Sequence, residues 1–92
     1  MNKEDFLEAI KQDGVYLVDI REAQELTSFP SNLPANHLPL SVILPNQDFS
    51  SLPKDKKIIT FCQSGGRSTM LNTLLVATGY DADYLEGGLS TL

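Results

Sequence analysis

The only cysteine of the chain, Cys62, stands where an apolar run meets a glycine-rich loop. The loop residues Gln63 to Gly66 are followed by Arg67 and then by a segment with helical periodicity. Backbone N–H groups of a loop that leads into a helix form a cradle for an anion. Such surroundings favour a thiolate over a thiol, which makes the sulfur nucleophilic near neutral pH. The pattern therefore predicts that Cys62 does chemistry.

The charge pattern around this loop also indicates a site for an anion. Apart from Cys62 and Tyr80, the only ionisable side chain between Phe61 and Tyr80 is that of Arg67. We therefore expect a locally positive pocket, whose amides would hold the negative charge of a covalent intermediate. The residues expected to line it are Gln63, Ser64, Gly65, Gly66 and Ser68. The alternative is a cysteine that packs as a small hydrophobe; the glycine pair, the arginine and the following helix argue against it.

Helical and extended segments alternate along the chain, which is typical of an α/β domain with a mainly parallel sheet. The run Val15–Ile20 is apolar without alternation, as in a strand that is buried on both faces. We expect one domain, residues 1–92, with four to five strands flanked by helices. The predicted helices lie between residues 2 and 14, at 21–26 and at 67–78. The predicted strands lie at 15–20, 40–44, 57–62 and 82–88, the last with the turn that follows it. A proline-rich loop is expected at 30–39.

The expected sheet brings two of the polar residues to one edge. Ligand sites of parallel sheets lie beyond the carboxyl ends of the strands, and Cys62 and Asp19 both stand at such ends. The helix at 67–78 is expected to bury one face, which makes Met70 a core residue rather than a sulfur ligand. That face carries Met70, Leu71, Leu74, Leu75 and Thr78.

Composition limits the classes of function. The 92 residues are 41% hydrophobic and 21% charged, as in a soluble globular protein. A net charge of −5 disfavours nucleic acid as a partner, and no apolar run approaches the ~18–20 residues that span a membrane. The charged N-terminus has no signal-peptide core, so we expect a cytoplasmic protein. With one cysteine, the chain can form neither an internal disulfide nor a multi-cysteine zinc site.

Four segments resemble those of single-domain rhodaneses. They are LVDIREAQEL, ANHLPLSVILP, FCQSGGRS and YLEGGL, and they come in the order of that family. The resemblance implies a small α/β domain and a sulfurtransferase. Cys62 would take the outer sulfur of thiosulfate or of another persulfide donor, become a persulfide, and pass the sulfur to cyanide, a thiol or an acceptor protein. Arg67 would close the loop and hold the anion, and neither a metal nor an organic cofactor would be needed.

The same resemblance assigns supporting roles to four residues outside the loop. Asp19, Arg21 and Glu25 match the first motif, and we expect Asp19 near the loop and the other two in an ion-pair network. The alternative is that all three are ordinary surface charges. His37 is the only histidine and could serve as a base for the cysteine. We expect a structural role for it, because the loop amides can already activate the thiol.

Departures from the family pattern leave alternatives open. Asn36 replaces the usual glycine before the histidine, the closing tryptophan is missing, and no further Lys or Arg lies between Cys62 and Arg67. Because the loop has no such extra cation, thiosulfate is expected to be a poor donor and a protein or small-molecule persulfide the better one. One rival is a phosphatase or arsenate reductase of the same fold, but those loops place arginine six positions after the cysteine, against five here. Others are a sulfur-carrier or sensing module that passes its persulfide to a partner protein, and a non-catalytic scaffold.

Overall fold

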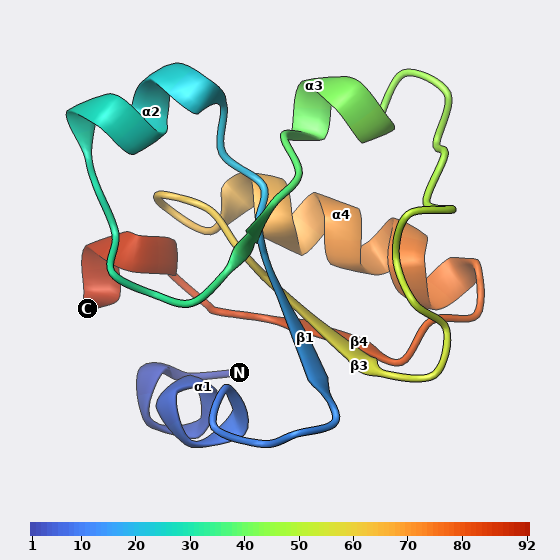
Figure 1. The fold of residues 1–92 in the computed structure, drawn as a ribbon, viewed down its shortest axis with the longest axis horizontal. Coiled ribbons are helices and arrows are strands. Elements are labelled where there is room, and N and C mark those ends of the chain that lie inside the picture. The colour runs from blue at the N-terminus through green and yellow to red at the C-terminus, as the bar shows by residue number, and fades with distance from the viewer.

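A four-stranded, fully parallel sheet forms the centre of the molecule (Figure 1). We describe a computed structural model that covers residues 1–92. The strands are β1 (Val15–Asp19), β2 (Asn36–His37), β3 (Lys57–Phe61) and β4 (Ala82–Tyr84), and their order across the sheet is β2-β1-β3-β4. The predicted α/β class and parallel sheet are confirmed.

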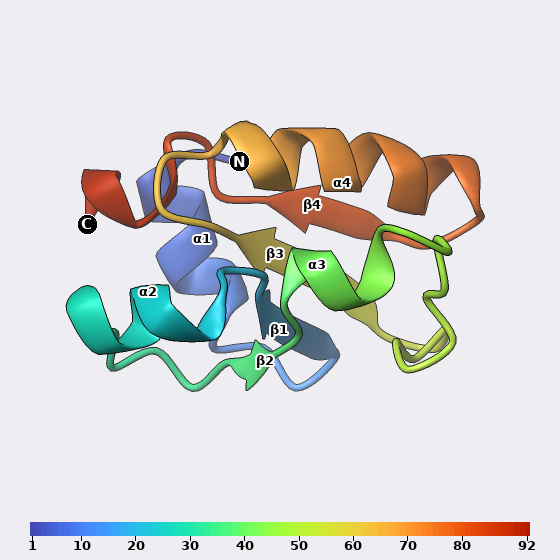
Figure 2. The same ribbon diagram turned by 90° about the horizontal axis from the view of Figure 1, so that it is seen from above.

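Helices cover both faces of this sheet. They are α1 (Lys3–Ala9), α2 (Ala23–Ser28), α3 (Leu40–Ile43), α4 (Gly66–Ala77) and a 3₁₀ helix, η1 (Gly88–Thr91). Figure 1 shows α1 on one side of the strands and α3 and α4 on the other, and Figure 2 shows α4 running beside β4. No helix combines the length and the apolar character needed to cross a membrane.

The side chains of β3 alternate between the two halves of the core, as the pleat of a strand requires. Ile58 and, just beyond the strand, Cys62 join the cluster under α3 and α4. Ile59 and Phe61 join the cluster under α1. Cys62 therefore continues the alternation of β3 and points to the same face of the sheet as Ile58.

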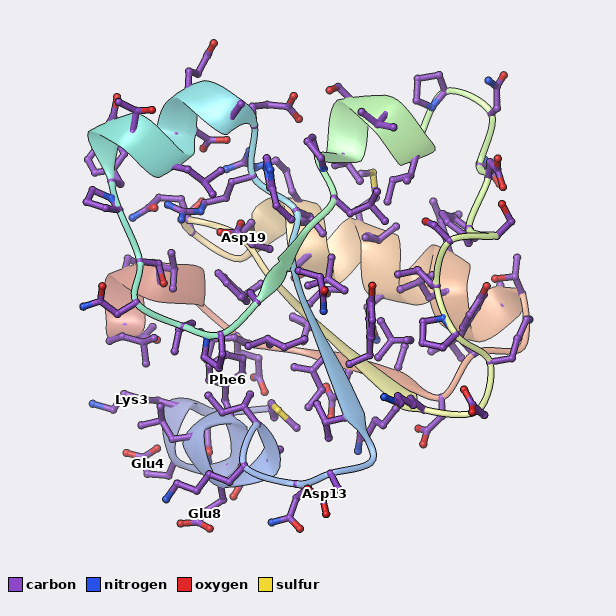
Figure 3. The ribbon with its side chains drawn as sticks, in the orientation of Figure 1. Lys3, Glu4, Phe6, Glu8, Asp13 and Asp19 are labelled. Carbon is purple, nitrogen blue, oxygen red and sulfur yellow. The ribbon has the colours of Figure 1, made fainter.

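The first helix is shorter than predicted. Its Asn2 cap forms as expected, since the Asn2 side chain accepts the Asp5 N–H at 2.8 Å. Only Phe6 of α1 is buried, and its ring meets that of Phe61 edge-on with 6.1 Å between the centroids. Figure 3 shows Phe6 between helix and sheet, with the charged side chains of α1 turned outward. The helix ends at Ala9, and turns lead to the first strand.

Two predictions between residues 30 and 44 were wrong. The segment 40–44 was expected to be a strand but forms α3, because Leu40 and Ile43 are buried while Val42 between them is 65% exposed. That spacing of three fits a helical turn, not a pleat. The proline-rich loop at 30–39 contains β2, whose two residues pair with the end of β1. A strand of two residues is too short to show a period.

The face of α4 was also partly misassigned. The helix buries Ser68, Leu71 and Leu75, whereas Met70, predicted as core, is 43% exposed. Residues 68, 71 and 75 follow the spacing of one narrow helical stripe. The sequence pattern could not distinguish this stripe from the neighbouring one, because both are rich in apolar residues.

Candidate active site

The carboxyl edge of the sheet brings the candidate site together. Cys62 follows β3, Arg21 follows β1, and the turn with Gly87 and Gly88 follows β4. Since all strands are parallel, these three segments meet at one edge, as predicted for Cys62 and Asp19.

The Cys62 sulfur is completely buried and hydrogen-bonded from two sides. The Gly65 N–H donates to it at 3.1 Å, and the Ser68 hydroxyl lies 3.4 Å away. Burial opposes ionisation of the thiol, but the Ser68 hydroxyl and the backbone N–H groups of Ser68, Gly65 and Arg67 outweigh it and hold the Cys62 pKa below its ordinary value. The N-terminus of α4 points its dipole to the same place. The surroundings therefore favour a thiolate.

The loop is shaped by glycine. Gly65 has a φ of 96°, and a Cβ there would lie 2.8 Å from the Gly87 nitrogen, so only glycine fits. Ser64 and Gly66 are exposed, whereas Gln63 is half-buried. Of the predicted loop residues, Gly65 and Ser68 contact the sulfur directly.

The turn after β4 supports the loop from behind, a contact that the sequence analysis did not predict. The Leu89 N–H donates to the Cys62 carbonyl at 2.9 Å, and the Ser90 N–H donates to the Gln63 carbonyl at 3.0 Å. A Cβ on Gly88, whose φ is 64°, would lie 2.5 Å from the Cys62 carbonyl oxygen. With their carbonyls held on this side, Cys62 and Gln63 keep the loop curled around the sulfur. The glycine pair in YLEGGL was the only signal for this contact.

Arg67 is engaged in an ion pair, which corrects the expectation of a locally positive pocket. Its two terminal nitrogens donate to the two carboxylate oxygens of Glu25 at 2.6 and 2.7 Å. The hydrogen bond from Arg67 lowers the Glu25 pKa to about 2, and the same pair raises the Arg67 pKa. The carboxylate comes from α2, far from the loop in sequence, so counting charges along the segment from Phe61 to Tyr80 could not reveal it.

A second ion pair lies underneath the loop. The Arg21 side chain is fully buried and pairs with Asp19 at 2.9 Å. Its other terminal nitrogen donates to the Gln63 side chain at 3.1 Å and to the Phe29 carbonyl at 2.7 Å. Arg21 thus links the end of β1 to the first loop residue. Arg21 and Glu25 were expected in one network, but each has a different partner.

His37 lies in β2 and is exposed. Its Nε2 atom is 2.7 Å from the Arg21 carbonyl oxygen. Because a carbonyl can only accept, Nε2 carries the proton of this hydrogen bond. The ring thus ties β2 to the segment after β1, the type of structural contact that we expected.

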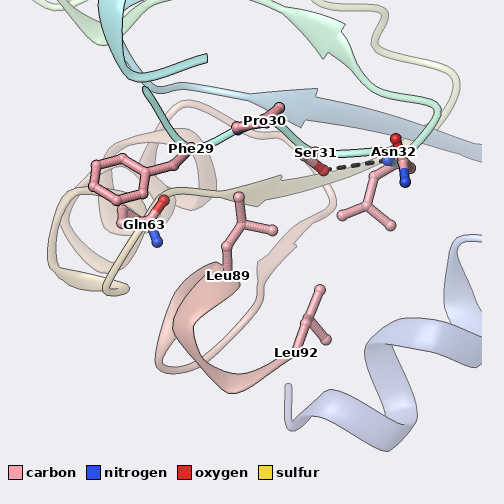
Figure 4. A pocket seen from close by; sticks show the side chains of 8 residues that line it. Phe29, Pro30, Ser31, Asn32, Gln63, Leu89 and Leu92 are labelled. Atoms are coloured by element: carbon pink, nitrogen blue, oxygen red, sulfur yellow. Dashed lines mark hydrogen bonds between the residues drawn. The ribbon is translucent and has the colours of Figure 1, made fainter. Parts of the chain in front are cut away.

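A cleft of about 390 Å³ opens beside the loop (Figure 4). Gln63 forms part of its wall, with Phe29 from the segment after α2 and with Leu89 and Leu92 from the C-terminal turn. The cleft does not include Cys62, whose sulfur is closed off by the loop. No group of three or more His, Cys, Asp or Glu side chains is placed to hold a metal ion.

Comparison with known proteins relates this chain to one family. The model of the rhodanese-like domain matches residues 2–91. The thiosulfate sulfurtransferase GlpE of Pseudomonas savastanoi pv. phaseolicola is 31% identical over 86 residues, which span 88% of this chain and 74% of that protein. The tRNA sulfurtransferase of Desulfurococcus amylolyticus is also 31% identical, over 84 residues that span 91% of this chain but 16% of that protein. This chain thus corresponds to a small part of the latter enzyme.

Solved structures agree with these sequence matches. A rhodanese homologue from Thermus thermophilus superposes with a TM-score of 0.79 at 34% identity, covering 100% of this chain and 98% of that one. A rhodanese-related protein from Thermoplasma volcanium gives a TM-score of 0.82 at 29% identity, covering 99% and 87% of the two chains.

Proposed function

Because this chain belongs to the rhodanese-like domain family, we propose that it is a sulfurtransferase that carries a sulfane sulfur as a persulfide on Cys62. The observation that carries the proposal is the hydrogen bonding of the Cys62 sulfur by Gly65 and Ser68, together with the lowered pKa of the thiol. A packing cysteine would need neither contact.

In the first half-reaction, the Cys62 thiolate attacks the outer sulfur of the donor. A new S–S bond forms at Cys62, the S–S bond of the donor breaks, and its electron pair leaves with the rest of the donor. Thiosulfate would release sulfite, and a persulfide would release a thiolate. The loop amides stabilise the negative charge on the outer sulfur of the product. Arg67, held by Glu25, fixes the loop to α2.

In the second half-reaction, a nucleophilic acceptor takes the outer sulfur and Cys62 returns to the thiolate. The 92 residues contain no second cysteine that could receive the sulfur, so the acceptor lies outside them. Cyanide would give thiocyanate, and a small thiol or the thiol of an acceptor protein would give a new persulfide. We also propose a cytoplasmic location, where a free thiol such as Cys62 remains reduced.

A second candidate is a sulfur carrier or sensing module that turns over slowly by itself. The complete burial of the Cys62 sulfur favours it, because a small donor reaches the thiol only when the loop opens. The cleft beside Gln63 would offer a surface to a docked acceptor protein. Slow turnover with small donors together with fast transfer to such a protein would identify the carrier.

The proposal is tested by the mass of the protein after incubation with a donor. Incubation with thiosulfate, or with glutathione persulfide, followed by removal of the excess, should add the mass of a sulfur atom. The gain should disappear on addition of cyanide and be absent from Cys62→Ser. Absence of the gain with both donors would contradict a persulfide on Cys62 and favour the phosphatase or the scaffold.

A further inference from the structure

The positive charges around Cys62 are already neutralised. Arg21 is fully buried against Asp19, so a donor cannot reach it. Arg67 is 34% exposed but has both terminal nitrogens on Glu25. The five lysines do not supply a replacement, because two lie on or just after α1, on the sheet face opposite to Cys62, and three lead into or begin the amino end of β3. They are Lys3, Lys11, Lys54, Lys56 and Lys57.

Carboxylates outnumber free cations at the entrance to the loop. Glu22 lies at the start of α2, where its carboxylate accepts from the Ser41 N–H and hydroxyl. It is close enough to Arg67 for its charge to contribute to the raised pKa of the guanidinium. Glu22 and Glu25 therefore both act on one exposed guanidinium. A dianion that approaches Cys62 meets two carboxylates, the one guanidinium that they share, and the thiolate itself.

We propose that Glu25 determines the donor class of this site: by holding the Arg67 guanidinium, it withdraws the one accessible positive charge beside Cys62, so that a small-thiol persulfide is a better donor than the dianion thiosulfate. The inference rests on the proposed function, since it concerns which donor loads Cys62. Glu25 acts through Arg67 and is a positioning residue.

Both donors transfer the same atom, but they differ in charge at the point of attack. With a persulfide RSSH, the Cys62 thiolate bonds to the outer sulfur, the S–S bond of the donor breaks, and RS⁻ leaves with the electron pair. The proton of the outer sulfur stays with the new Cys62 persulfide or passes to water. With thiosulfate, sulfite leaves and the outer sulfur remains on Cys62 as an anion. Thiosulfate brings two negative charges into the loop, and the persulfide brings at most one.

The ion pair between Glu25 and Arg67 persists across the pH range of an ordinary assay. The Glu25 pKa of about 2 keeps the carboxylate ionised in any neutral or mildly acidic assay. Its oxygens also accept the Glu22 N–H at 2.7 Å, which fixes the carboxylate to the first turn of α2. The carboxylate that pairs with Arg67 is therefore fixed in position. Since α2 has no buried residue, a substitution at Glu25 is expected to leave the core intact.

The test compares two donors with three proteins: the unaltered chain, Glu25→Gln and the matched control Glu22→Gln. Loading of Cys62 is followed by intact mass, with thiosulfate or with 2-hydroxyethyl persulfide as donor, and KM and kcat are obtained for each. In Glu25→Gln, we expect KM for thiosulfate to fall roughly three- to tenfold, the size of a partly screened charge interaction. Any loosening of the loop would change loading by both donors alike, so the result is read from the ratio of the two KM values, which should fall for thiosulfate relative to the persulfide. Glu22→Gln removes the same charge but leaves Arg67 paired, so it should have the smaller effect.

Each outcome decides a separate point. A selective gain for thiosulfate in Glu25→Gln supports the inference. An unchanged ratio between the donors, or an equal gain in Glu22→Gln, overturns it while the proposed function stands. If neither donor loads Cys62 in the unaltered chain, the proposed function fails and the inference fails with it. Should Glu25→Gln not fold, Glu25→Ala removes the same charge, and the same comparison between donors decides.

Discussion

At the scale of single residues, the proposed chemistry depends on how burial and hydrogen bonding set the pKa of the Cys62 thiol. Burial alone would keep the thiol protonated. The Gly65 N–H and the Ser68 hydroxyl reverse that preference by contacting the sulfur directly. Because the folded pKa is lowered, ionisation of Cys62 adds stability above the pKa of an unfolded thiol, and this stability is lost as the pH falls through the folded pKa.

The first prediction is a shifted titration of Cys62. The ultraviolet absorbance of the Cys62 thiolate, which needs no reagent to reach the buried sulfur, should rise with pH around a midpoint below the ~8.5 of a free thiol. Ser68→Ala removes the hydroxyl that lies 3.4 Å from the sulfur and should move the midpoint upward. Ser64→Ala is the control, since the side chain of this neighbouring serine is exposed. Equal midpoints in all three proteins would show that Ser68 does not stabilise the thiolate.

The residues of the candidate site that the sequence predicted are those that lie close together along the chain. Cys62, the glycine pair and Arg67 stand within one short segment, so their roles could be inferred together. The charge of Arg67 could not be judged in the same way, because its partner Glu25 approaches from another element. Electrostatic balance depends on distances in space, and these are not visible in a segment.

At the scale of elements, the active-site loop is held between two supports. On one side Arg21 and Glu25 contact Gln63 and Arg67. On the other side, the start of η1 donates to the carbonyls of Cys62 and Gln63. With its carbonyls held outward, the loop can direct its N–H groups to the sulfur. The turn after β4 therefore supports the loop through its backbone.

The second prediction concerns this turn. Gly88→Ala should destabilise the protein by about 2 kcal/mol or more, because the new methyl group combines a strained φ with a backbone clash. It should also slow the loading of Cys62, since the displaced atoms are the Cys62 and Gln63 carbonyls. Gly14→Ala, which meets nothing within 4 Å, should change the free energy of unfolding by less than about 0.5 kcal/mol. Urea unfolding of both variants measures the difference, and equal stabilities would contradict this account of the turn.

Helices and strands could be predicted from the sequence where their pattern of apolar residues was long. The buried strands β1 and β3 and the long helix α4 follow from their apolar runs. The segment that became α3 was misassigned because five apolar-rich residues fit a strand or a helical turn equally well. Burial of Leu40 and Ile43 against the rest of the core stabilises the helix. This packing involves residues that are distant in the sequence, so a local pattern does not show it.

At the scale of the whole molecule, the sheet separates two clusters of core residues. One cluster lies under α3 and α4 and includes Cys62, and the other lies under α1. Cys62 is thus anchored in the larger half of the core. Its position follows from the packing of α4 on the sheet as much as from the loop.

The third prediction tests this packing and the corrected face of α4. Leu71→Ala should cost about 2–5 kcal/mol of unfolding free energy, because Leu71 is fully buried. Met70→Ala, at a position that is 43% exposed, should change the stability by less than about 0.5 kcal/mol. Chemical denaturation compares the two. A larger loss for Met70→Ala would restore the original assignment of the face and refute the one described.

The most direct test of sulfur transfer uses protein that already carries the sulfur. The chain is loaded with a persulfide donor, freed of that donor by gel filtration, and then mixed with cyanide. With its single cysteine, the loaded protein should release one equivalent of thiocyanate while its mass returns to that of the unloaded chain. Thiocyanate that appears only while free donor is present, or appears equally with Cys62→Ser, would contradict a persulfide on Cys62 as the intermediate.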